Sequence, residues 1–160
     1  MSSHDELRSH LHELLRGGQA HVTFDDAIAE LPASLRGTRP DSLPYSPWEL
    51  VEHIRITQRD ILDYTVARTK SDYEELAWPQ GYWPKTSAPP SAKAWDDSIT
   101  AVRADREAME QLVKDGDLFA TLPASTGDHT LLREALLLAD HNAYHIGELV
   151  AVRRLLGAWR

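Results

Sequence analysis

Residues 128–160 read DHTLLREALLLADHNAYHIGELVAVRRLLGAWR, a pattern typical of one long helix packed in a protein core. Apolar residues recur there at helical spacing over about eight turns. Two histidines, His141 and His145, stand four positions apart inside this apolar stripe. Residues at that spacing project from one face of a helix, so both imidazoles point the same way. His145 lies seven residues from both Leu138 and Val152, which gives it the phase of the buried stripe.

Two imidazoles that face a core need partners, because a buried polar group left unpaired is costly. A metal ion is one such partner, and neighbouring side chains or backbone carbonyls are the other. An isolated H-x-x-x-H pair belongs more often to core or surface histidines than to a metal site, so the pair alone leaves both interpretations open.

The composition limits the classes of protein to which the chain can belong. Its 160 residues, 42% of them hydrophobic, fit one domain that spans residues 1–160. A net charge of -8 argues against nucleic-acid binding, which requires a basic patch. The absence of cysteine excludes disulfides and zinc–thiolate sites. The first residues do not resemble a signal peptide, and no apolar run is long enough to span a bilayer. We therefore expect a soluble cytoplasmic protein without membrane contact.

Helix signals recur along the rest of the chain. Ser46-Pro47-Trp48-Glu49 combines an N-cap, a proline at the first helical position and a capping-box glutamate, and predicts a helix to about Lys70. The last helix is expected to start near Asp128 or Thr130. Because no segment alternates convincingly with period two, the sequence predicts an all-α fold, a four-helix bundle with a long connection before the third long helix. The other expected helices span about 4–16, 24–31, 71–76 and 92–114.

An aromatic and proline-rich connection covers residues 78–90, which read WPQGYWPKTSAPP. Four prolines and a glycine exclude regular structure there. Trp78, Tyr82 and Trp83 are large rings to leave in water, so they either pack on the bundle or wall the mouth of a pocket. Long ordered loops are often functional, and the sequence does not decide between the two roles.

A third histidine changes the interpretation of the pair. His53 lies in the second turn of the helix that follows Ser46, and a facing helix could bring it against His141 and His145. Three neutral imidazoles form one face of a coordination site and leave positions open for water or substrate, which is typical of a catalytic site. Imidazole suits zinc, nickel, iron and copper, so the identity of the metal stays open.

Segments 46–60 and 141–159 resemble the two histidine helices of the DinB-like superfamily, and 78–84 is similar to a loop of one branch. The likeness covers about residues 4–160. It implies a four-helix bundle that holds a divalent metal such as zinc, nickel or iron. Members are described as metal-dependent hydrolases, some are transferases that use an external low-molecular-weight thiol, and dimers are common. The resemblance carries the metal ligands over to His53, His141 and His145.

Two further polar residues, Glu148 and Asp60, are candidates for supporting roles. Glu148, about one turn from His145, could hydrogen-bond a histidine, act as a base or bind the metal. The family often has glutamine there, so Glu148 is a weak catalytic candidate. Asp60, seven residues after His53, could support the site from outside, although a solvated charge is the simpler interpretation. His129 lies too far along its helix to share a metal with the pair.

Three hypotheses follow. The first is a mononuclear metal enzyme, a hydrolase or thiol-dependent transferase, that acts on a small molecule. The second is a non-catalytic metal- or ligand-binding bundle that works as a homodimer. The third is a plain helical protein whose histidines hydrogen-bond in the core. The chain has no H-E-x-x-H, G-x-S-x-G or P-loop motif, and any thiol must come from outside because there is no cysteine.

Overall fold

The computed structural model describes residues 2–159, so Met1 and Arg160 of the predicted domain lie outside the described residues. These residues form five α-helices, three short 3-10 turns and no named strand, which confirms the all-α prediction. None of these helices combines the length and the apolarity that crossing a membrane requires. The helices are α1 (Ser3–Arg16), α2 (Phe24–Ile28), α3 (Pro47–Val66), α4 (Ala92–Asp115) and α5 (Leu131–Leu155); the turns are η1 (Ala33–Leu35), η2 (Lys70–Asp72) and η3 (Gln80–Tyr82).

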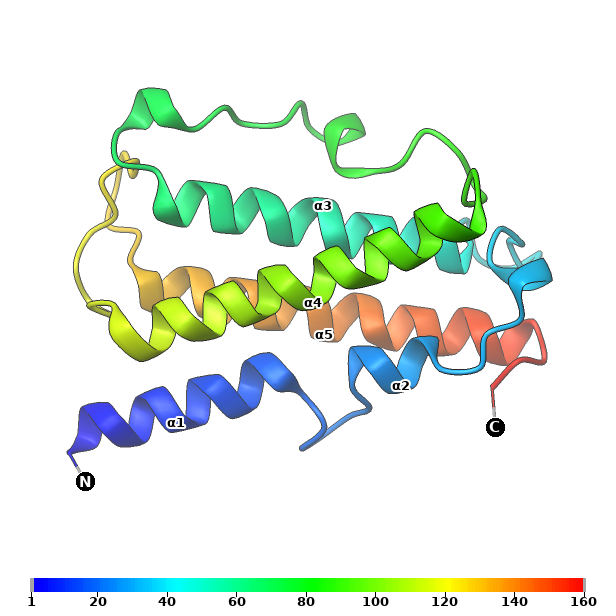
Figure 1. The fold of residues 1–160 in the computed structure, drawn as a ribbon, viewed down its shortest axis with the longest axis horizontal. Helices are drawn as coiled ribbons and strands as arrows, with labels where there is room; N and C mark the ends of the chain where they lie inside the picture. Colours follow the sequence, from blue (N-terminus) through cyan, green and yellow to red (C-terminus); the bar gives the residue numbers. More distant parts are fainter. Residues whose placement is uncertain (1, 160) are drawn as a thin grey trace.

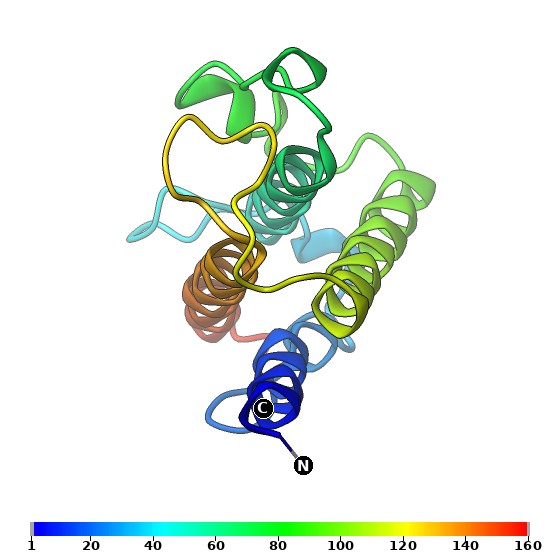
Figure 2. The same ribbon diagram turned by 90° about the vertical axis from the view of Figure 1, so that its left-hand side faces the viewer.

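Three long helices pack side by side, and the two N-terminal helices complete the bundle. α3 contacts both α4 and α5, whereas α1 packs against α4 and α5, and α2 against α5 (Figure 1). α3 and α4 run in the same direction because residues 67–91 return along the length of α3 before α4 begins (Figures 1 and 2). This long connection makes the topology different from a simple up-down-up-down bundle.

The core consists of two apolar clusters, one toward each end of the bundle. Trp48 and Leu149 belong to the first, and Met109 and Leu138 belong to the second. On α5 the residues of the two clusters are separated by the segment 140–145, which contains both histidines of the pair. The histidines therefore lie in a polar layer between two apolar clusters.

Capping groups set the starts of the two helices that carry the histidines. Ser46 accepts a hydrogen bond from the Glu49 amide at 3.2 Å, and the Glu49 carboxylate accepts one from the Ser46 amide at 2.8 Å. This reciprocal pair confirms the predicted capping box and fixes the start of α3. Thr130, rather than Asp128, is the N-cap of α5.

Three predicted helical segments are wrong in extent. α3 ends at Val66 instead of about Lys70, and the helix expected over 71–76 is replaced by the single turn η2. Residues 68–72 are all exposed, so a longer helix would bury no apolar face there. α2 ends at Ile28 instead of about Leu31, because the next residue, Ala29, has an extended ψ of 136° and Glu30 then takes a positive φ of 55°, neither of which a right-handed helix allows.

Candidate metal centre

Three imidazoles from two helices converge on one point. α3 contributes His53, and α5 contributes His141 and His145. The Nε2 atom of His53 lies 3.0 Å from Nε2 of His145 and 3.1 Å from Nε2 of His141. Nitrogens bound to one ion at about 2.0–2.1 Å, with angles of about 90–110° between them, lie about 2.9–3.4 Å apart. The three rings could therefore hold one metal ion.

Burial keeps these imidazoles neutral. The residues His53 and His145 are buried, with 6% and 9% of their surface exposed, and His141 is half-buried. Burial, followed by the charges of the neighbouring imidazoles, lowers the pKa of His141 to about 4. The same causes lower the pKa of His145 to about 4, and burial also lowers the pKa of His53. Neutral imidazole is the form that binds metals, so the site is ready for a cation at pH 7.

The Nδ1 atoms of two of the rings donate hydrogen bonds to protein oxygens. Nδ1 of His53 lies 2.7 Å from the carbonyl oxygen of Tyr82, and Nδ1 of His145 lies 2.7 Å from a carboxylate oxygen of Glu148. Both oxygens accept hydrogen bonds, so each Nδ1 carries the proton of its neutral ring. The Nε2 atom of each ring then carries a lone pair and no proton. The Nε2 atoms of His53 and His145 therefore lie 3.0 Å apart without a proton between them.

This arrangement fits a metal better than a hydrogen-bonded core. Two lone pairs that face each other repel, and a cation between them turns the repulsion into attraction. Histidines that bind metals characteristically donate their second N–H to a carboxylate or a backbone carbonyl, as His53 and His145 do here. Nδ1 of His141 is buried and has no hydrogen-bond partner among the described residues. No acceptor in this part of the chain therefore fixes the orientation of the His141 ring as one does for His53 and His145.

Two aromatic rings fix the plane of His53. The Trp83 ring stacks on the His53 ring with a centroid distance of 3.9 Å and an interplanar angle of 2°. The Tyr45 ring stacks in turn on the Trp83 ring, with a centroid distance of 4.5 Å and an interplanar angle of 8°. The imidazole of His53 is therefore held both by the Tyr82 carbonyl and by a flat aromatic surface.

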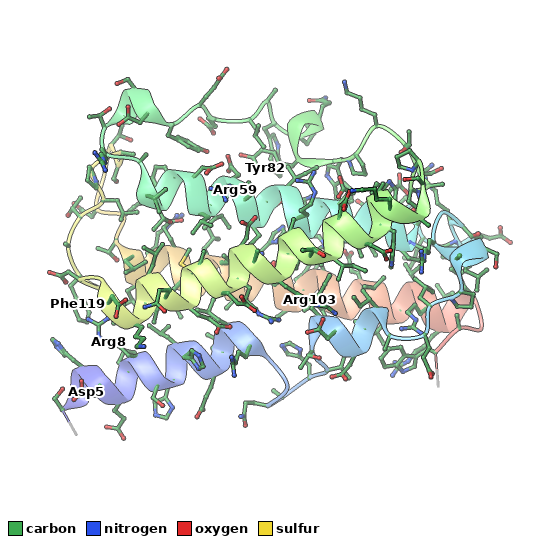
Figure 3. The ribbon with its side chains drawn as sticks, in the orientation of Figure 1. Asp5, Arg8, Arg59, Tyr82, Arg103 and Phe119 are labelled. Atoms are coloured by element: carbon green, nitrogen blue, oxygen red, sulfur yellow. The ribbon has the colours of Figure 1, made fainter. Side chains whose placement is uncertain are left out.

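Asp60 ties the connecting segment to α3. Its two carboxylate oxygens accept hydrogen bonds from the hydroxyls of Tyr73 at 2.9 Å and Tyr82 at 3.0 Å. Figure 3 shows Tyr82 between α3 and the connection. Burial raises the pKa of the Asp60 carboxyl. The interpretation of Asp60 as a solvated charge is therefore wrong; its seven-residue spacing from His53 was the signal that it faces the site.

A pocket of about 310 Å³ opens beside the histidines. Of the three predicted ring residues, Trp78 and Tyr82 line it, whereas Trp83 is not among its lining residues and packs on His53 instead. The remaining open side of a bound ion would therefore face this pocket. The full lining comprises His53, Thr57, Asp60, Ile61, Trp78, Tyr82, Leu137, His141 and His145.

Two other polar residues considered in the sequence, Glu148 and His129, lie outside the pocket. Glu148 is not a lining residue, and one of its oxygens is bound to His145, so its geometry suits orienting that ring. His129 lies just before α5 and is 2.9 Å from the hydroxyl of Tyr64. It does not belong to the three-histidine group.

Comparison with known proteins agrees with this arrangement. A family model described as the DinB superfamily matches residues 18–149, a range that contains all three histidines and confirms the resemblance seen in the sequence. No curated protein and no solved structure matches the chain.

Proposed function

The chain belongs to the DinB superfamily, and we propose that it is a mononuclear metal-dependent enzyme that acts on a small molecule. The observation that carries this proposal is the distance of 3.0 Å between the Nε2 atoms of His53 and His145, whose Nδ1 atoms both lie at hydrogen-bond distance from acceptor oxygens. His141 adds a third nitrogen at 3.1 Å from His53. Zinc, nickel and iron all accept imidazole nitrogen, and the proposal includes each of them.

The residues around the site supply binding and orientation. A divalent ion supplies Lewis acidity, which polarises a carbonyl or activates a water or a thiol. The Tyr82 carbonyl and Trp83 orient His53, and Glu148 orients His145. All three histidines line the pocket, which gives a substrate access to them. Hydrolysis and thiol transfer both use such an open face, and for transfer the thiol is external.

Turnover by the metal-loaded protein tests the proposal. Untagged protein is stripped with a chelator and reloaded with zinc, nickel or iron. Each form is then assayed with esters, amides and pairs of a thiol and an electrophile. We expect a rate that requires metal, that is lost in the His141→Ala/His145→Ala double variant, and that persists in a His10→Ala control, since His10 is exposed on α1.

Two outcomes would contradict the enzymatic proposal. Metal binding without any metal-dependent rate would favour the non-catalytic metal-binding bundle. An equal rate in the double variant and in the wild type would place the chemistry away from the three histidines.

A further inference from the structure

We propose that the pocket beside the three histidines selects an uncharged, largely apolar small molecule whose single polar head reaches the metal. This inference rests on the proposed metal site and names the class of substrate that the site accepts.

The walls of the pocket are mainly apolar and aromatic. Ile61 of α3 and Leu137 of α5 line it, and the Trp78 and Tyr82 rings lie against each other at 5.7 Å. Leu137 is 38% exposed and Trp78 is 78% exposed. Large apolar side chains left in water around a concave site mark where a ligand covers them. The energetically favourable occupant is therefore one that buries apolar surface against these side chains.

The charges of the lining favour an uncharged ligand body. The residues that line the pocket in the described part of the chain include no lysine or arginine. Asp60 is the only carboxylate among them, and a tyrosine hydroxyl already occupies each of its oxygens. An acidic substituent would find no cationic side chain, and a basic one would share the single carboxylate of Asp60 with two tyrosine hydroxyls. Burying either charge unpaired is costly.

The size and position of the pocket limit the ligand further. Its volume of about 310 Å³ lies at the low end for small-molecule sites. A larger pocket of about 750 Å³ shares Asp60 with it and is bordered by charged side chains such as Arg55 and Arg59. None of the three histidines lines that larger pocket. A ligand that must touch the metal therefore occupies the smaller, apolar pocket.

Hydroxamate probes test the inference, because they share one zinc-binding head and differ only in the body. The affinities of acetohydroxamate, benzohydroxamate and two benzohydroxamates with a para carboxylate or a para aminomethyl group are measured on the zinc-loaded protein. We expect benzohydroxamate to bind at least about 10-fold more tightly than acetohydroxamate, because the phenyl ring leaves water. Each charged analogue should bind at least about 10-fold more weakly than benzohydroxamate.

Two neighbouring leucines of α5 provide a matched pair of variants. Leu137 lines the pocket, whereas Leu136 is 44% exposed and is not a lining residue. Leu137→Arg should weaken benzohydroxamate binding about 10-fold and shift the preference toward the carboxylate analogue. Leu136→Arg should leave both affinities unchanged.

Titrations of the wild type and of each variant with zinc, nickel and iron separate failure of the metal site from failure of the pocket inference. If the wild type binds none of these metals, the proposed metal site fails, and the pocket inference fails with it. If zinc binds but benzohydroxamate gains nothing over acetohydroxamate, the inference alone is overturned. It is also overturned if Leu137→Arg and Leu136→Arg behave alike.

Discussion

Replacement of Glu148 by alanine should weaken zinc binding while leaving the bundle folded. Its carboxylate accepts a hydrogen bond of 2.7 Å from Nδ1 of His145, which keeps the Nε2 lone pair of that ring turned toward His53. Without the carboxylate, the ring can rotate and its Nδ1 proton has no fixed acceptor. The free protein must then order this ring at the moment when the metal binds.

The size of the effect follows from this one contact. A hydrogen bond to a charged group contributes about 1.5–3 kcal/mol. The Glu148 side chain is 29% exposed, so solvent screening favours the lower half of that range. Since about 1.4 kcal/mol is a factor of ten, the Kd for zinc should rise about 10- to 40-fold in Glu148→Ala. Glu148→Gln keeps an oxygen acceptor and should cost less than about 10-fold.

Competition against a chromophoric zinc chelator at neutral pH measures these affinities. Glu107→Ala is the control, because Glu107 is exposed on α4 and its loss changes the net charge equally. A Kd for Glu148→Ala within about twofold of both the wild type and this control would refute the orienting role of Glu148.

Three other predictions follow from the fold and the site. Asp60→Ala removes the acceptor of the Tyr82 hydroxyl, so the connecting segment that holds His53 should loosen and zinc binding should weaken about 10-fold. In the metal-free variant, the nitrogen NMR shifts of His53 should show a mixture of tautomers. Shifts equal to those of the wild type would contradict this. The metal-free protein should lose stability as the pH falls from about 6.5 to about 4. The pKa of His141 and of His145 is lower in the folded protein than in the unfolded chain, so over this range the unfolded chain takes up protons on these histidines and is stabilised. A melting temperature that does not change over this range would contradict the prediction. Leu138→Ala should lower the free energy of unfolding by about 2–5 kcal/mol in denaturant titration, because Leu138 is fully buried in a core cluster, and a loss below about 1 kcal/mol would be inconsistent with that packing.

Local signals in the sequence were sufficient for the helices that carry the site. The Ser46 capping box and the apolar period around Leu138 placed α3 and α5 close to where the structure has them. The end of α3 was missed, because a helix stops where packing ceases and the exposure of residues 68–72 depends on the path of the following segment. Helix propensity carries no information about that path.

Part of the candidate site could likewise be predicted from the sequence, and part of it could not. Spacing alone put His141 and His145 on one face and Glu148 within reach of His145. The carbonyl that fixes His53 could not be predicted, because a backbone oxygen has no sequence identity and becomes a partner only through the fold. The hydroxyls that bind Asp60 could not be predicted either, because they come from the connection between α3 and α4, whose path along α3 the sequence does not specify.

The most direct test of the central claim is the zinc stoichiometry of untagged protein and of the three single histidine-to-alanine variants at positions 53, 141 and 145. Purified protein is equilibrated with zinc, desalted and analysed for metal, and His129→Ala, which lies outside the group, serves as the control. The proposed site predicts about one zinc per chain in the wild type and in the control, and a large loss in each of the three variants. Zinc contents that are near zero in the wild type, or equal in all five proteins, would contradict it.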